Sequence, residues 1–88
     1  MKVLVLYRPD SEHGRLVEEF IRDFKRIGTD SSLEVLNIDS RDGSATASLY
    51  DIMQYPAILV IQNDGYLQKS WIGNEIPLLD EVVAYVHA

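Results

Sequence analysis

Cysteine is absent from the 88 residues of this chain. The chain therefore has no disulfide, no thiolate nucleophile and no cysteine-ligated metal site. Histidine is almost as scarce: only His13 and His87 occur, and neither has the spacing from carboxylates that is typical of a metal cage. The sequence excludes thiol chemistry, and we predict no metal and no other cofactor.

Basic residues are also few. Eight Lys and Arg stand against fourteen Asp and Glu, which gives a net charge of −6. A nucleic-acid-binding protein concentrates Lys and Arg on one surface. Here Arg15, Arg22, Lys25 and Arg26 instead alternate with acids along one predicted helix. This pattern predicts a solvated, salt-bridged helix face and no nucleic-acid partner.

Long apolar runs are missing as well. No segment approaches the ~20 apolar residues that a membrane helix needs. The run after Lys2 is too short for a secretory signal, and no small-residue cleavage site follows it. We therefore expect a cytoplasmic protein with no membrane partner, folded as one domain over residues 1–88. Charged and polar residues in its predicted edge strands favour a monomer.

The chain does contain a regular alternation of strand and helix patterns. Residues 2–7 form an almost continuous apolar run, which predicts a central strand buried on both faces. Pro9 ends this strand, and Asp10 or Ser11 is expected to cap a helix over residues 12–27. Gly28 is the expected stop of that helix.

The remaining elements are predicted in the following order. They are a strand over residues 33–38, a weakly encoded helix over 44–52, a strand over 57–61, a turn at 63–65, a strand over 66–71 and a helix over 75–86. Asn74 is the expected cap of the last helix, with Pro77 in its first turn.

Each predicted helix has an apolar face for the sheet. The expected buried residues are Leu16, Val17, Phe20, Ile21, Phe24 and Ile27 in the first helix, Ala45, Ala47, Leu49 and Ile52 in the second, and Ile76, Leu79, Val82, Val83 and Val86 in the third. A helical crossover makes the first two strands parallel, and the turn at 63–65 makes the last two an antiparallel hairpin. We predict an α/β fold of order βαβ-α-ββα, with a four-stranded mixed sheet flanked by three helices.

Two local patterns resemble the thioredoxin-like superfamily. The stretch from Tyr7 to Gly14 is similar to the thioredoxin and glutaredoxin segment in which a short proline loop leads into a C-x-x-C at a helix start. Ser11 and Gly14 stand where the two cysteines would be. The resemblance covers essentially the whole chain and implies a thioredoxin-like fold.

The second pattern lies before the third strand. The sequence from Tyr50 to Pro56 resembles the Tyr-x-Ile segment that precedes the cis-proline of thioredoxins. Gly65 and the Trp-Ile-Gly sequence at 71–73 also match. This resemblance implies a cis peptide bond between Tyr55 and Pro56.

The departures from the family decide what activity the resemblance implies. Both cysteines are absent, and Val5 stands where many thioredoxins carry a buried carboxylate. A serine hydroxyl cannot replace them, because disulfide exchange needs a thiolate that forms near neutral pH. The resemblance therefore implies a redox-inactive domain that is not a dithiol-disulfide oxidoreductase, and it favours a protein without enzymatic activity.

A groove beside the proline is the candidate site. In the family, the residue before the cis-proline offers its backbone to an extended peptide. The matching positions here are Ser11, Glu12, His13, Gln54, Tyr55, Pro56, Trp71, Gly73 and Asn74. The competing interpretation is that Pro56 only shapes the core and that Tyr55 and Trp71 are packing residues. The free N–H groups of residues 11–14 are a further candidate, as an anion site.

Three other functions remain open at this stage. The first is glutathione binding through the Ser11 hydroxyl, as in some glutathione transferases; Lys69-Ser70 only loosely resembles the acidic-Ser pair that holds glutathione there. The second is one-thiol chemistry similar to that of a monothiol glutaredoxin, if Ser11 replaces a native cysteine. The third is a small structural domain whose partner uses another face.

The absence of sulfur nucleophiles gives a direct prediction. With dithiothreitol present, the chain should not accelerate the reduction of insulin above the rate with dithiothreitol alone, measured as turbidity. Any protein-dependent acceleration would contradict the assignment of a redox-inactive domain.

Overall fold

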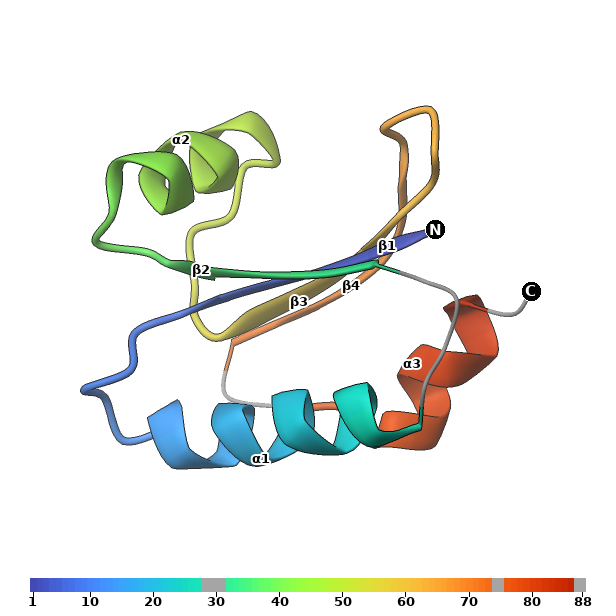
Figure 1. Cartoon of the computed structure of the whole chain (residues 1–88). Coiled ribbons are helices and arrows are strands. Elements are labelled where there is room, and N and C mark those ends of the chain that lie inside the picture. Colours follow the sequence, from blue (N-terminus) through green and yellow to red (C-terminus); the bar gives the residue numbers. More distant parts are fainter. Residues whose placement is uncertain (28–31, 74–75, 87–88) are drawn as a thin grey trace.

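The alternation of strand and helix is present in the computed structural model, which describes residues 1–27, 32–73 and 76–86 (Figure 1). Its elements are β1 (Lys2–Tyr7), α1 (Gly14–Arg26), β2 (Ser32–Asn37), α2 (Arg41–Leu49), β3 (Ala57–Ile61), β4 (Leu67–Ile72) and α3 (Leu79–Val86). The predicted α/β class and element order are confirmed.

The four strands form one mixed sheet of order β2-β1-β3-β4. β1 is parallel to β2 and antiparallel to β3, and β3 is antiparallel to β4. Figure 1 shows α1 and α3 below the sheet and α2 above it. The chain is therefore a three-layer structure, as the crossover and hairpin patterns predict.

The two central strands supply most of the core. Every residue of β3 is buried, as is every residue of β1 after Lys2. Alternate side chains serve opposite faces. The core toward α1 and α3 contains Val3, Val5, Tyr7, Val17, Phe20, Phe24, Ile58, Val60, Val82 and Val86. The core toward α2 contains Leu4, Leu6, Ala47, Ile52, Ala57, Leu59 and Ile61.

The start of α1 differs from the prediction. The helix begins at Gly14, and its N-cap is His13, which makes no side-chain cap bond. Asp10 and Ser11 therefore both lie before the cap position. The N–H and the hydroxyl of Ser11 both donate to the carbonyl of Arg8. The residues that sequence propensity assigns to a helix start instead close a separate turn.

The buried face of α1 is also narrower than predicted. Val17, Phe20 and Phe24 are buried, whereas Leu16 and Ile27 are 58% and 45% exposed. Because α1 shares this face of the sheet with α3, only the central stripe of α1 contacts the core.

The second helix starts earlier than predicted. α2 begins at Arg41 because Ser40 is its N-cap, with the Ser40 hydroxyl accepting from the N–H of Gly43 at 3.0 Å. The Asp-Gly pair at 42–43 is typical of a turn, which hid the helix start in the sequence. Of its expected core residues, Ala47 is buried, whereas Ala45 and Leu49 are exposed; Ile52 is buried but lies beyond the helix.

The third helix starts later than predicted. α3 begins at Leu79, so Pro77 precedes the helix and does not lie in its first turn. Val82 and Val86 are buried as expected, and Ile76, Leu79 and Val83 are half-buried. The expected cap Asn74 and the expected stop Gly28 lie outside the described residues. No helix in the described ranges has the length and apolarity to cross a membrane.

Gly43 lies where α2 packs closely against the end of β2. A Cβ at this position would lie 2.0 Å from the carbonyl oxygen of Asn37, the last residue of β2. Gly43→Ala should therefore lower the free energy of unfolding by about 1–3 kcal/mol despite the better helix propensity of Ala. Urea denaturation measures the change. The control Ser44→Ala, at an exposed helix position, should change it by less than about 0.5 kcal/mol, and equal effects would contradict this account.

Candidate binding site

Three chain segments meet at one edge of the sheet. β1 and β3 are antiparallel and pair Leu6 with Ala57, so the end of β1 lies beside the start of β3. Arg8 follows the first strand, and Tyr55-Pro56, joined by a cis peptide bond, precedes the second. The end of β4 joins them because the N–H of Gly73 donates to the carbonyl of Pro56 at 3.0 Å.

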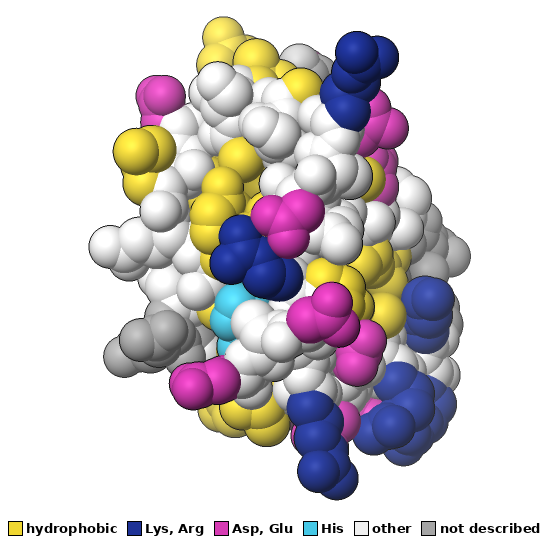
Figure 2. Space-filling view, turned by 90° about the vertical axis from the view of Figure 1, so that its left-hand side faces the viewer, with side chains coloured by type: hydrophobic (Ala, Val, Ile, Leu, Met, Phe, Trp, Pro, Cys, Tyr) yellow, Lys and Arg dark blue, Asp and Glu magenta, His cyan; other side chains and the backbone are white. Residues whose placement is uncertain are grey.

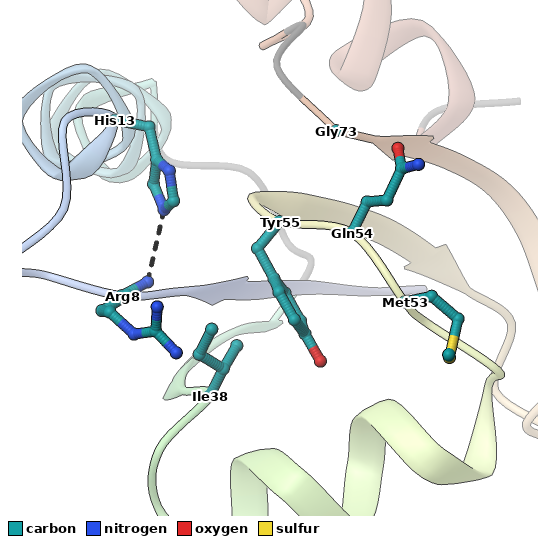
Figure 3. Close-up of a pocket in the computed structure, with 7 residues that line it drawn as sticks. All are labelled: Arg8, His13, Ile38, Met53, Gln54, Tyr55 and Gly73. Atoms are coloured by element: carbon teal, nitrogen blue, oxygen red, sulfur yellow. Dashed lines mark hydrogen bonds between the residues drawn. The ribbon is translucent and has the colours of Figure 1, made fainter.

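These segments enclose an open hollow of about 440 Å³. Its lining residues are Arg8, His13, Ile38, Met53, Gln54, Tyr55 and Gly73 (Figure 3). On the same face, Figure 2 shows the cyan histidine beside dark blue basic side chains, with yellow hydrophobic surface on both sides. The hollow therefore offers both apolar surface and polar groups to a ligand.

The structure brings together four of the predicted site residues. His13, Gln54, Tyr55 and Gly73 line the hollow. Ser11, Glu12, Pro56 and Trp71 do not line it. Pro56 is fully buried beneath it, and Asn74 lies outside the described residues.

Trp71 instead belongs to the core. It pairs with Ile58, whose side chain faces α1 and α3, so Trp71 points to that side of the sheet. Its ring meets Tyr85 edge-on at 5.6 Å, and the Lys69 ammonium lies 5.8 Å from the centroid of each ring. For this residue the packing interpretation holds.

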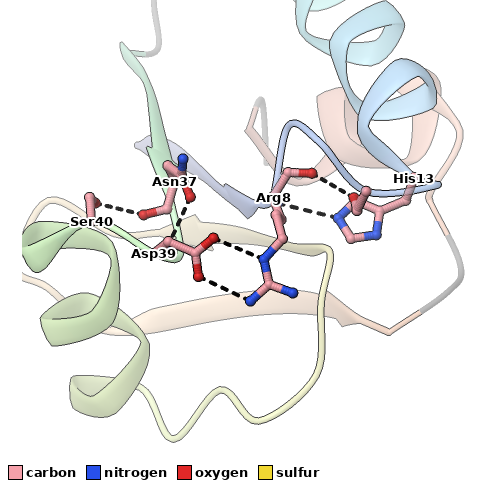
Figure 4. Close-up of polar contacts among 6 residues, drawn as sticks. Arg8, His13, Asn37, Asp39 and Ser40 are labelled. Carbon is pink, nitrogen blue, oxygen red and sulfur yellow. Dashed lines mark hydrogen bonds and ion pairs between the residues drawn. The ribbon is translucent and has the colours of Figure 1, made fainter.

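Sequence reasoning missed Arg8, Ile38 and Met53. Arg8 forms a two-pronged ion pair with Asp39, with Nε–Oδ2 at 2.9 Å and Nη2–Oδ1 at 3.0 Å (Figure 4). Asn37 positions the acid, since its side-chain oxygen accepts from the N–H of Asp39 at 2.9 Å. The hydrogen bond from Arg8 lowers the pKa of Asp39 and raises that of Arg8.

The register of the sheet explains this pair. β1 and β2 are parallel, and Tyr7 pairs with Asn37. The residues that follow the two strands are therefore neighbours, although Arg8 and Asp39 are far apart in sequence. Pairing the residues after the two predicted parallel strands would have found the contact.

His13 is tied to the same loop. The backbone N–H of Arg8 donates to its Nε2 at 3.4 Å, which assigns the ring proton of the neutral form to Nδ1 (Figure 4). Partial burial and then the positive charge of Arg8 lower the pKa of His13. At neutral pH the ring therefore presents an uncharged Nδ1–H donor.

The turn from Arg8 to Gly14 is closed by its own hydrogen bonds. The N–H of Ser11 donates to the carbonyl of Arg8, and the N–H of Gly14 donates to the carbonyl of Ser11. Two of the N–H groups expected to bind an anion are thus already paired. A Cβ on Gly14 would lie 2.2 Å from the carbonyl oxygen of Pro9. A cysteine at position 14 would therefore require the backbone to move.

Comparison with known proteins places the fold. No protein-family model and no curated protein sequence matches the chain. Solved structures do match it. Thioredoxin O2 from Arabidopsis thaliana, in the oxidised state, superposes with a TM-score of 0.74 at 13% identity over 98% of this chain and 71% of that one.

Two other structures are similarly close. Thioredoxin 1 from the thermophilic eubacterium Thermosipho africanus gives a TM-score of 0.73 at 13% identity, over 99% of this chain and 91% of that one. A malarial protein gives 0.78 at 11% identity, over 98% and 92% of the two chains. The chain therefore has a thioredoxin-like fold, and it has this fold without cysteine.

The contacts of His13 predict its titration. Its pKa, followed by NMR of the ring protons, should lie below the usual value of about 6.5 and should rise in Arg8→Gln without reaching that value, because burial remains. The contribution of His13 to the free energy of unfolding is then complete above about pH 6.5, and it is lost as the pH falls toward the pKa of His13 in the folded protein. A wild-type pKa at or above the usual value would contradict the geometry.

Proposed function

We propose that this chain is a binding module that holds an extended peptide segment of a partner protein in the hollow. The observation that carries the proposal is the open hollow itself, built by the segments after β1, β2 and β4 and the segment before β3. Its volume of about 440 Å³ lies within the range of small-ligand sites. That space accommodates the side chains of a few peptide residues.

The lining suits a peptide. Met53 is 86% exposed, and its flexible thioether adapts to varied apolar side chains. Tyr55 and Ile38 add half-buried apolar surface. Polar groups lie beside them: the amide of Gln54, the Nδ1–H of neutral His13 and the guanidinium of Arg8, which Asp39 holds in place. Such a mixture fixes the orientation of a ligand while apolar contacts supply affinity.

Binding without electron transfer follows from the composition. The chain has no sulfur nucleophile to attack a disulfide. The proposed partner is therefore held without being oxidised or reduced, and no cofactor is needed.

Glutathione is a weaker candidate for the same hollow. The Ser11 hydroxyl donates to the carbonyl of Arg8, so its proton is already used, and Ser11 does not line the hollow. One-thiol chemistry would require a cysteine at position 11 in the natural gene. Titration calorimetry with millimolar glutathione distinguishes the candidates: heat of binding supports glutathione, and its absence leaves the peptide proposal.

Peptides selected by the full chain from a random display library test the proposal. Gln54→Arg places a long side chain in the hollow from an exposed position, and it should weaken binding of the selected peptides by at least ~10-fold, about 1.4 kcal/mol. The matched control Gln68→Arg is also exposed but lies on β4 away from the hollow, and it should leave binding unchanged. Fluorescence anisotropy of labelled peptides gives the affinities.

Two results would reject the hollow as the site. One is a library that yields no binder. The other is a set of binders that is equally tight in wild type and Gln54→Arg. Circular dichroism of both variants checks that each remains folded.

A further inference from the structure

A second exposed apolar surface lies on the side of the sheet that carries α2. We call it the α2-side strip. Its members are Leu49, Met53, Leu67 and Ile72, with exposed fractions of 75%, 86%, 40% and 42%. Surface apolar residues that occur singly need no explanation, but a group on one face marks a contact surface.

Two contacts place the segment after α2 beside the two ends of β4. The hydroxyl of Tyr50 donates to the carbonyl of Gly65 at 3.4 Å, which ties the end of α2 to the β3–β4 hairpin. At the other end of β4, the side-chain oxygen of Gln54 lies 3.0 Å from the place of a Cβ on Gly73. The side chains of Tyr50 and Gln54 therefore reach the residues that precede and follow β4.

The register of β4 fixes which side its residues face. Leu67 pairs with Ile61, and Ile72 pairs with Ala57. Ile61 and Ala57 both belong to the core beneath α2. Paired residues point to the same side of a sheet, so Leu67 and Ile72 face the side of α2.

This side of the sheet is only partly covered. α1 and α3 share the opposite face, whereas α2 alone lies on this one, and its contacts with the sheet are concentrated on β2 (Figure 1). Over the edge strand β4 no helix lies on this side within residues 1–27, 32–73 and 76–86. A sheet face is normally covered by helices, and a helix ~10 Å wide spans about two strands.

The chain segment that supplies most of the strip carries only negative charge. Residues 42–68 contain Asp42, Asp51 and Asp64 but no Lys, Arg or His. Asp51 and Asp64 are exposed in the two loops that border the strip. The amino group of Met1 is bonded to the Asn63 side chain at 2.9 Å, and Lys69 lies over Trp71 on the other side of the sheet. Lys2 pairs with Ile61 and so faces the side of the strip, but its ammonium forms an ion pair with Glu34 at 2.6 Å.

We infer that the α2-side strip docks an amphipathic helix of a partner protein, with an apolar stripe flanked by Lys and Arg. The apolar stripe covers Leu49, Leu67 and Ile72, and the basic residues face Asp51 and Asp64. The partly covered sheet favours a helix as the bound segment, and the acidic border favours a helix with basic residues. This surface is distinct from the hollow, which it meets only at Met53.

Two synthetic peptides of ~18 residues, about 27 Å of helix, are the probes. Both carry the same leucine stripe, and their polar faces are all Lys in one and all Glu in the other. Titrated into the isotopically labelled full chain, the Leu/Lys peptide should shift backbone amides of residues 49–53 and 64–72. The Leu/Glu peptide should bind at least ~10-fold more weakly, since its charge repels the acidic border.

Variants separate this surface from general attraction to an acidic protein. Leu49→Ser and Leu67→Ser should each weaken binding of the Leu/Lys peptide about tenfold. The control Leu16→Ser removes from α1 a leucine whose exposed fraction, 58%, lies between those of Leu49 and Leu67, and it should not weaken binding of the Leu/Lys peptide.

Asp51→Asn and Asp64→Asn together should reduce the salt dependence of binding of the Leu/Lys peptide, whereas Asp80→Asn on α3 should not. Asparagine suits the left-handed backbone of Asp51, φ 56°, and keeps the oxygen through which Asp64 accepts from the N–H of Tyr66.

Three outcomes overturn the inference. The first is a set of amide shifts centred on α1 or α3, and the second is equal affinity for the two peptides. The third is self-association of the chain that Leu67→Ser abolishes, because the strip would then bind a second copy of the chain. The hollow is tested separately, by the affinities of the library-selected peptides.

Discussion

The antiparallel pairing of β1 with β3 is the constraint on which the rest of the structure depends. These two strands are buried on both faces and hold the two halves of the chain together. Their opposite directions place the loop after Tyr7 beside the loop before Ala57. The hollow forms at that edge because both loops must leave the sheet there, and the end of β4 closes it through the bond between Gly73 and Pro56.

The central strands were predictable because their signal is local. A run of apolar, β-branched residues at 2–7 and 57–61 describes a strand covered on both sides, and the turn at 63–65 joins the last pair. The helix starts were not predictable to the residue. Ser11 has the propensity of a cap but closes a turn, whereas Ser40, in a stretch that reads as a loop, is the cap of α2.

The candidate site was only half predictable, for a similar reason. His13, Gln54, Tyr55 and Gly73 follow from the resemblance, and they do line the hollow. The contact of Arg8 with Asp39 depends on the register between two parallel strands, so it becomes visible only when the residues that follow the two predicted strands are paired. The resemblance assigned Trp71 to the groove, whereas its pairing with Ile58 directs it to the side of α1 and α3, as the competing packing interpretation expects.

The loop from Arg8 to Gly14 is closed by its own contacts. Gly14 packs against the carbonyl of Pro9 so closely that a side chain does not fit, and Ser11 bonds to Arg8. The segment from 50 to 55 borders both proposed surfaces: Gln54 and Tyr55 line the hollow, and Met53 belongs to both the hollow and the α2-side strip. One connection between α2 and β3 thus contributes to both proposed contact surfaces.

The most direct test of the central claim is a crystal structure of the chain with a library-selected peptide. The account predicts an extended peptide in the hollow, between the Arg8–His13 loop and Gln54-Tyr55, with a side chain against Met53. A peptide bound on any other surface, with the hollow left open, would contradict it.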